Sequence, residues 1–419
     1  MPLNYLFVDM NAYFASVEQQ ERTCLRHRPV AVVPVMTDHT CCIATSYEAK
    51  QYGVHTGTMA GQARQLCPQI RLVASRPKRY VEYHHRIVAA VESCLHISAV
   101  HSVDEMSCRL LGQEHNYEQA EKLARKVKAT LRHQVGQYLR CSIGLGGNVW
   151  LAKVAADMHK PDGLVAINHR QLPQRLYGLE LIDLPGIGQR MRRRLACHGV
   201  QTVEQLCELS PDQLAGIWGS RVLARQWWHQ LRGEDLPAAQ TRRRTVGHSH
   251  VLPPSLRSDG GGYTVLVRLI HKAAQRMRHM NYRAQSMWVH VSFLDSPKWK
   301  LHRALAPPCA DTLSLLRMFR QMWRHKPGGR PLKVGVTLCG LTPSNSDTAA
   351  LFDGEHRLDH LARTMDRVNR RFGPDAVYFA AMHGAQRHAP MRIAFGHVPD
   401  LDLPNVFEDD QPTVTAGLD

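Results

Sequence analysis

The chain has 419 residues, of which 44% are hydrophobic, enough for two to four domains with apolar cores. Its 53 Lys and Arg against 36 Asp and Glu give a formal charge of +17, which favours a polyanionic partner, nucleic acid before membrane. Eleven scattered cysteines without a Cys-x-x-Cys pair argue against a disulfide framework or a zinc ribbon, and for a reducing, cytoplasmic location. We expect neither a signal peptide nor a membrane span, because no charged leader and no stretch of ~20 apolar residues occurs.

The charge is unevenly distributed along the chain. Residues 262–340 contain fourteen Lys or Arg and two Asp, a local excess of twelve positive charges. The last twenty residues contain six acidic residues and neither Lys nor Arg. A basic module beside an acidic tail indicates a polarised molecule, which solubility alone does not require.

The first part of the chain mixes strands and crossing helices. Strands are expected at residues 5–8, 29–34, 41–47 and 139–145, with a hairpin over 97–111. Helices are expected at residues 12–20, 80–95, 117–136 and 149–158, with a short one broken at Gly53 and Gly57. This mixture predicts an α+β core.

The second part begins with a helical stretch and continues as a separate module. Residues 171–236 are expected to be helical with Gly and Pro breaks, and 240–244 to be an inter-domain linker. Residues 246–341 predict a small sheet with two helices, 263–279 and 311–324, on one face. A further helix is expected at 358–372, and a loosely held tail from about residue 390.

Three acidic residues stand next to apolar strands. Asp9 directly follows the first strand, and Asp104 and Glu105 lie near the turn of the hairpin. Acids at strand ends can converge on one point, and three hard oxygen donors suit Mg²⁺. A pair of such ions stabilises the attacking and leaving oxygens of an in-line phosphoryl displacement. Taken singly, each acid is better explained as an ordinary turn or cap residue.

Two further patterns indicate phosphate contacts. Tyr47 and Lys50 are three residues apart and share a face if a helix begins there, so a hydroxyl and an ammonium would form a phosphate clamp. By itself, a solvated helix start explains them better. Lys160 stands where a helix gives way to a loop, and can either reach a phosphate or satisfy the helix dipole.

A glycine-containing turn indicates a nucleic-acid partner. Gly186, Ile187 and Gly188 precede a basic helix that contains Arg190, a pattern typical of a helix–hairpin–helix. The glycines allow backbone N–H groups at the helix N-terminus to meet a DNA phosphate. This motif indicates the partner and leaves the reaction open.

Taken together, these motifs resemble the Y-family DNA polymerases, and within them the bacterial DNA polymerase IV-like branch. The resemblance extends from about residue 6 to residue 372. The five motifs occur in the order typical of the family, at residues 8–18, 46–50, 102–105, 142–163 and 186–188.

The resemblance implies a right-hand polymerase architecture of the α+β class. The expected domains are a palm at 1–11 and 76–167, small fingers at 12–75, a helical thumb at 168–239, an α+β little finger at 245–345, and a C-terminal helix with an acidic tail at 346–419.

The resemblance also implies the roles of individual residues. Asp9, Asp104 and Glu105 match the family's catalytic, metal-binding acids, and the carbonyl of Met10 completes one metal site. Phe14 matches the steric gate, the ring that clashes with a ribose 2′-hydroxyl. The remaining nucleotide contacts match Tyr13, Tyr47, Lys50 and Lys160. The expected cofactors are two Mg²⁺ ions, with Mn²⁺ able to substitute.

The activity implied is low-fidelity translesion synthesis from dNTPs on primer–template DNA, in DNA repair and damage tolerance, by a monomer without proofreading. Relatives bind the sliding clamp through short peptides, and the candidates here are Leu351 with Phe352, or the acidic tail. Lys50 stands where Arg is commoner and therefore lacks a bidentate fork. Ala44 replaces a common Thr, and Val149 a common Lys. A catalytically silent DNA-binding scaffold and a helix–hairpin–helix nuclease are the alternatives.

Overall fold

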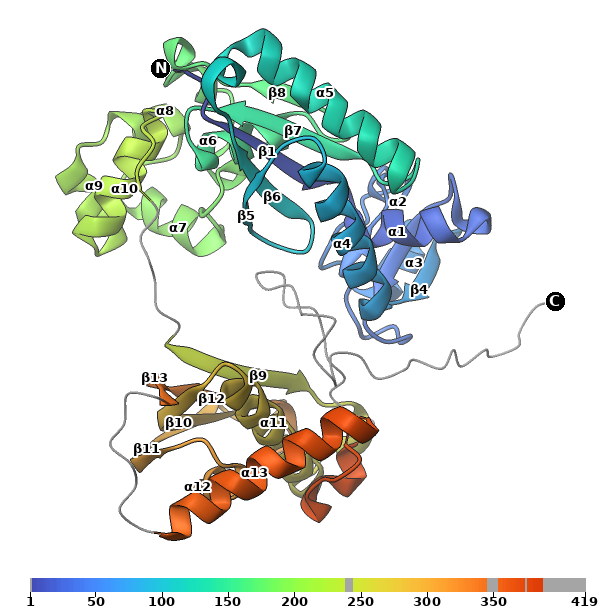
Figure 1. The fold of residues 1–419 in the computed structure, drawn as a ribbon, viewed down its shortest axis with the longest axis vertical. Coiled ribbons are helices and arrows are strands. Elements are labelled where there is room, and N and C mark those ends of the chain that lie inside the picture. Colours follow the sequence, from blue (N-terminus) through green and yellow to red (C-terminus); the bar gives the residue numbers. More distant parts are fainter. Residues whose placement is uncertain (1, 238–243, 345–352, 374, 387–419) are drawn as a thin grey trace. The chain divides into compact units, whose positions relative to one another are not determined.

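The computed structural model describes residues 2–237, 244–344, 353–373 and 375–386 (Figure 1). The chain forms two compact units, one up to residue 237 and one from residue 244. Most of the expected linker, the expected clamp-binding pair at 351 and 352, and the acidic tail lie outside the described residues. Within the described ranges, no helix combines the length and the apolar character that crossing a membrane requires.

A five-stranded sheet in the order β5-β6-β1-β7-β8 is the centre of the first unit. Its strands are β1 (Tyr5–Met10), β5 (Ile97–Val100), β6 (Glu105–Arg109), β7 (Cys141–Gly146) and β8 (Leu164–Ala166). The central strand β1 runs antiparallel to both of its neighbours, β6 and β7. The expected hairpin and first strand are confirmed, and the mainly antiparallel sheet with helices confirms the α+β class.

Alternation along β1 sends its side chains to two different layers. Leu6, Val8 and Met10 lie in the main core with residues of α1 (Tyr13–Glu21), α4 (Pro77–Glu92) and α5 (Tyr117–Gln134). Tyr5 and Phe7 face the other side and pack against α6 (Val149–Met158). The same alternation puts the side chain of Asp9 on the α6 side of the sheet.

Helix α6 approaches the sheet closely because β7 carries glycines where the two meet. A Cβ at Gly144 would overlap the carbonyl of Ala152, and one at Gly146 would crowd the amide of the same residue. Asn148 caps the helix by accepting a hydrogen bond from the amide of Leu151 at 2.7 Å. The structure gives α6 the bounds expected from the sequence.

A smaller sheet, β3-β2-β4, forms between β1 and α4 in the sequence. It consists of β2 (Val30–Val33), β3 (Ala44–Thr45) and β4 (Arg71–Ala74), and is accompanied by α2 (Tyr47–Lys50) and α3 (Ala60–Leu66). The strand expected over 41–47 is much shorter than predicted. Cys41 makes only an isolated bridge with Met59, and the hydroxyl of Ser46 caps α2, so the strand ends at Thr45.

Four helices complete the first unit, as expected over 171–236. They are α7 (Gln189–Cys197), α8 (Val203–Glu208), α9 (Pro211–Trp218) and α10 (Arg221–Leu231). Thr202 and Ser210 form capping boxes with Gln205 and Gln213, which accounts for the sharp starts of α8 and α9. Their shared apolar core also contains Leu151 of α6, so α6 packs against both the sheet and these helices.

The second unit is an antiparallel sheet in the order β11-β10-β12-β9, with helices on one face. Its strands are β9 (Thr245–Val251), β10 (Tyr282–Phe293), β11 (Trp299–Cys309) and β12 (Pro331–Cys339), with β13 (Thr342–Pro343) at the start of β10. Helices α11 (Asp259–His279) and α12 (Thr312–Trp323) contribute to the same apolar core as the sheet. The expected sheet with two helices on one face is confirmed.

Helix α13 (Asp353–Phe372) and the residues just after it are attached to α11 by buried ion pairs. The guanidinium of Arg278 donates to both carboxylate oxygens of Asp366, at 2.7 and 2.8 Å. Arg268 of α11 pairs with Asp375 at 2.8 Å, just beyond α13. Both arginines are almost fully buried, so α13 is a structural part of this unit rather than an appendage.

We expect Asp366→Asn to destabilise the second unit by about 2–4 kcal/mol, because it leaves the buried Arg278 without its charged partner. Asp359→Asn is the control, since its ion pair with Arg363 is partly exposed, with 44% of the Arg363 side chain accessible, and should contribute less than about 1 kcal/mol. Urea titration of the full chain, followed by hydrogen exchange of α11 peptides, measures both. If Asp366→Asn and Asp359→Asn lost the same small amount of stability, the structural role of α13 would be contradicted.

Candidate active site

The three acids expected at strand ends lie at one corner of the five-stranded sheet. Asp9 lies directly opposite Glu105 in the antiparallel pair of β1 and β6. Asp104 occupies the turn before β6, and its carbonyl accepts a hydrogen bond from the amide of Met10 at 2.9 Å. The corner thus brings together residues almost a hundred positions apart in the sequence.

Each acid has a close partner. Lys160, beyond the end of α6, lies 2.8 Å from Asp9 and 2.7 Å from Asp157. Lys153 of α6 contacts both carboxylate oxygens of Glu105 at 2.5 Å. Asp104 instead accepts a hydrogen bond from the hydroxyl of Ser102. Of these partners, the sequence analysis had selected only Lys160.

Burial makes the corner unfavourable for negative charge. It raises the pKa of Asp9 from 3.8 to about 7, although Lys160 acts in the opposite direction. Burial also raises the pKa of Asp104, against the hydrogen bond from Ser102. For Lys160, burial alone would lower the pKa, but Asp9 and Asp157 together raise it.

The donor chemistry of the corner fits a hard divalent cation. Four carboxyl groups, those of Asp9, Asp104, Glu105 and Asp157, lie beside the ammonium groups of Lys153 and Lys160, so the acids outnumber the lysines that contact them. Oxygen donors of this kind are the ligands that Mg²⁺ prefers. As the side chains stand, the described part of the chain holds no group of three acidic, His or Cys residues arranged around one ion position. The lysines that pair with Asp9 and Glu105 must therefore release those carboxylates when an ion binds.

Asn11 positions the loop that carries Lys160. Its Oδ1 accepts a hydrogen bond from the amide of Asp162 at 2.7 Å, and its Nδ2 donates to the hydroxyl of Ser142 at 3.1 Å. Asn11 is 3% exposed, so these contacts are shielded from water. The residue thus connects the end of β1 to the loop after α6.

Tyr47 and Lys50 lie side by side on α2, as their spacing predicted. The ammonium of Lys50 lies 4.1 Å from the centre of the Tyr47 ring. Burial lowers the pKa of Lys50, and the positive charge of Lys160 lowers it further. The pKa of Tyr47 is raised by burial and responds to Lys160 and Asp9 as well. The corner and α2 therefore share one electrostatic environment.

The chain enters α1 through a left-handed residue. Ala12 has φ 49° and ψ 43°, so α1 begins at Tyr13, one residue later than expected. The hydroxyl of Tyr13 donates to the carbonyl of Tyr80 at 2.6 Å. The ring of Phe14 stacks on that of Tyr80, with centroids 4.2 Å apart and planes 11° apart, and Phe14 is 5% exposed.

The helix–hairpin–helix turn presents its backbone to solvent. Ile187 is buried in the helical core, while Gly186, Gly188 and Arg190 are exposed. Gly186 adopts φ +100° and lies against Trp227, a combination that favours glycine. Gly188 begins α7 without a side-chain cap, so the first N–H groups of the helix lack a side-chain partner there.

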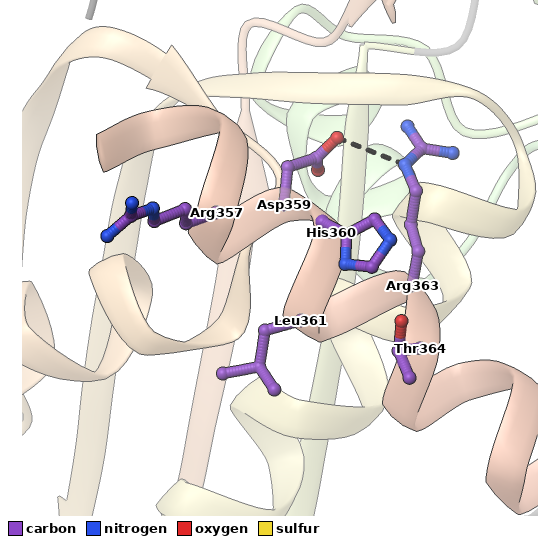
Figure 2. Close-up of a pocket in the computed structure, with 6 residues that line it drawn as sticks. All are labelled: Arg357, Asp359, His360, Leu361, Arg363 and Thr364. Carbon is purple, nitrogen blue, oxygen red and sulfur yellow. Dashed lines mark hydrogen bonds and ion pairs between the residues drawn. The ribbon is translucent and has the colours of Figure 1, made fainter. Parts of the chain in front are cut away.

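The hollow shown in Figure 2 is separate from this chemistry. It lies on α13 in the second unit, where Asp359 accepts a hydrogen bond from Arg363 at 3.0 Å. Its lining residues are Arg357, Asp359, His360, Leu361, Arg363 and Thr364, and none of them is a predicted site residue.

The sequence analysis missed Lys153 and Asp157 as members of the site. The two residues are four apart and share a face of α6, and Lys160 follows three residues after Asp157, just beyond the end of the helix. That spacing is visible in the sequence and could have been used. The stacking of Tyr80 on Phe14 joins two distant helices and has no comparable local signal.

Family models match most of the described chain. A model described as the impB/mucB/samB family matches residues 8–157, and one for the C-terminal domain of that family matches residues 243–351. A model of a SAM-like helix-hairpin-helix tandem matches residues 178–221, which include the Gly186–Gly188 turn.

Curated relatives and solved structures agree with these matches. The chain is 31% identical over 385 residues to DNA polymerase IV of Moorella thermoacetica, covering 90% of this chain and 95% of the relative. It is 29% identical over 383 residues to DNA polymerase IV of Pelotomaculum thermopropionicum, covering 89% and 93%. A Y-family chimera of the Dbh and Dpo4 polymerases has a similar fold, with a TM-score of 0.67, 22% identity, and coverage of 81% of this chain and 100% of the chimera.

The raised pKa of Asp9 predicts how stability depends on pH. The folded protein holds this proton more tightly than the unfolded chain, so the contribution of Asp9 to stability is present below about pH 4 and is lost as the pH rises through about 7. Metal-free Asp9→Asn should therefore be more stable than the parent at pH 8, by up to about 4 kcal/mol, with a difference near zero at pH 4.

Urea unfolding in EDTA at several pH values measures this difference. Glu121→Gln, which removes an acid of α5 paired with the exposed Arg125, is the control and should track the parent throughout. A parent that is more stable than Asp9→Asn at pH 8 would mean that the ion pair with Lys160 outweighs the cost of burial.

Proposed function

Because this chain belongs to the impB/mucB/samB family, and within it to the Y-family DNA polymerases of the DNA polymerase IV type, we propose that the corner of β1, β6 and α6 is its nucleotidyl-transfer site. The protein is a metal-dependent, template-directed DNA polymerase of low fidelity that carries out translesion synthesis from dNTPs on DNA. The observation that supports the site is the pairing of Asp9 with Glu105 in register, beside Asp104 and the lysines of α6.

The acids at this corner are assigned to the metal ions. Asp9, Asp104, Glu105 and the carbonyl of Met10 would hold two Mg²⁺ ions, with Mn²⁺ able to substitute. When bound, such ions stabilise negative charge on the attacking and departing oxygens. The raised pKa values of Asp9 and Asp104 support this assignment, because a buried carboxylate is stable as an ion only when a positive charge compensates it.

The lysines and Tyr47 are assigned to the triphosphate. An ammonium group has three donors, so Lys160 can keep its contact with Asp157 while it donates to a phosphate oxygen. Lys50 and Tyr47 supply a second ammonium and a hydroxyl from α2. The lowered pKa of Lys50 supports the proposal, because a polyanion placed here would offset the burial and the Lys160 charge that lower it.

Residues at the start of α1 are assigned to the sugar. The backbone at Tyr13 and Phe14 follows Asp9 and Met10 by only a few residues, so a nucleotide bound at the acids passes close to it. The ring of Phe14 would exclude a 2′-hydroxyl by steric clash. It is backed by Tyr80 and cannot retreat without disturbing the core.

Contacts with DNA are assigned to both units. The exposed N–H groups near Gly186 and Gly188 and the guanidinium of Arg190 suit a phosphate, which supports the helix–hairpin–helix as a backbone contact. In the second unit, the sheet face opposite the helices carries Trp288, whose ring lies 5.6 Å from the ammonium of Lys300. An aromatic ring beside a cation suits a sequence-independent contact with nucleic acid.

We also propose a cytoplasmic location and a monomeric state. All eleven cysteines are free, including the exposed Cys24, Cys41 and Cys197, which supports a reducing compartment. Binding of the sliding clamp through Leu351 and Phe352, or through the acidic tail, is proposed from the sequence alone.

We expect Asp104→Ala to lower primer extension by about a thousandfold or more while primer–template binding stays within about twofold, because a metal ligand is lost and the DNA contacts remain. Single-nucleotide incorporation with Mg²⁺ and fluorescence anisotropy measure the two effects. Glu121→Ala on α5 is the control and should extend normally. Substantial extension by Asp104→Ala would remove this acid from the site, and an inactive parent would favour a DNA-binding scaffold.

We expect Phe14→Ala to incorporate ribonucleotides, because a methyl group leaves room for the 2′-hydroxyl. The ratio of kcat/KM for dCTP over that for CTP should fall to within about tenfold of unity. Steady-state incorporation opposite a template G measures it. A ratio equal to that of the parent would mean that Phe14 is only a core residue.

A further inference from the structure

The ring of Phe14 rests on a residue that is held in place at three points. Tyr80, in α4, is fully buried and stacks face to face on Phe14. Its backbone carbonyl accepts the hydroxyl of Tyr13 at 2.6 Å, so both of the first residues of α1 contact it. Its own hydroxyl donates to Oε1 of Glu18 at 2.8 Å.

The third point of support is an ion pair that holds Glu18, the residue that accepts the hydrogen bond from the Tyr80 hydroxyl. Glu18 is fully buried, and Arg76 donates to both of its carboxylate oxygens at 3.0 and 2.7 Å. Phe14 and Glu18 are four residues apart on α1, and Arg76 and Tyr80 are four apart at the start of α4. The two helices therefore meet through two matching pairs, one aromatic and one charged.

Apolar packing alone does not require this arrangement. Burying the charge of Glu18 is costly unless it is paired and hydrogen-bonded, and two apolar residues would fill the space without that cost. What the charged pair adds is a fixed position for the hydroxyl of Tyr80, and hence for its ring. Burial raises the pKa of Tyr80 well above its ordinary value, so the hydroxyl keeps the proton that it donates.

We propose that Tyr80, held by Glu18 and Arg76, is a positioning residue. It fixes the position of the Phe14 ring and thereby sets the discrimination between deoxyribonucleotides and ribonucleotides. The proposal rests on the proposed role of Phe14 as the steric gate. A clash with one oxygen atom depends on the ring position to a fraction of an ångström. Replacing Tyr80 by a residue that supports the ring less firmly should therefore lower sugar selectivity before it abolishes synthesis.

The test is sugar selectivity, measured as the ratio of kcat/KM for dCTP over CTP in the full-length protein. Tyr80→Leu keeps apolar bulk but removes the flat support, and should lower the ratio by roughly tenfold. Tyr80→Phe keeps the ring and loses the hydroxyl, and should lower it by less. Glu18→Met should resemble Tyr80→Phe, because both remove the hydrogen bond between these two side chains. Tyr83→Leu, which removes a buried ring of α4 that lies against Arg86, is the matched control and should keep the parent ratio.

A double-mutant cycle separates this inference from its premise. In the Phe14→Ala background, Tyr80→Leu should have no further effect on the ratio, because there is no ring left to position. If Phe14→Ala lowers the ratio and Tyr80→Leu lowers only the overall rate, the inference is overturned and the gate stands. If Phe14→Ala itself keeps the parent ratio, the gate assignment fails first. Should Tyr80→Leu not fold, parent ratios in both Tyr80→Phe and Glu18→Met would overturn the proposal.

Discussion

The close approach of α6 to the five-stranded sheet is the constraint on which the candidate site depends. Gly144 and Gly146 leave no side chain between β7 and the backbone of α6 near Ala152. A larger residue at either position would push the helix away from β1. The ammonium of Lys153 would then move away from Glu105, and that of Lys160 away from Asp9. Backbone packing on one face thus sets the geometry of charges at the corner.

The electrostatics of the corner follow from this packing. Asp9 is buried because it lies between the sheet and the end of α6, and burial of an acid is stabilised only by a compensating positive charge. Lys160 supplies part of that charge, but it also contacts Asp157. Asp9, whose pKa is raised to about 7, is therefore partly protonated at neutral pH, which favours exchange of its proton for a cation.

Helices and strands whose bounds depend on neighbouring residues in the sequence could be predicted well. The bounds of α6 follow from Asn148 at its start and from the apolar spacing that packs Leu151 into the core of helices α7 to α10. The acids were selected because they follow apolar strands, and register then placed Asp9 opposite Glu105. The strand expected over 41–47 was too long because the cap formed by Ser46 was not recognised. Contacts between distant helices, such as Phe14 on Tyr80, have no local pattern and could not be predicted.

One departure from local rules lies just after the end of β1. Ala12 adopts a left-handed conformation that costs a non-glycine residue energy, and no local interaction of its side chain offsets it. What the turn achieves is a change of direction within two residues, from Asp9 and Met10 at the acids to Tyr13 and Phe14 on Tyr80. Asn11 uses the same turn to hold the Lys160 loop through the amide of Asp162. One strained residue therefore connects the acids, the Lys160 loop and the ring of Phe14, and a relaxed backbone at this position would separate them.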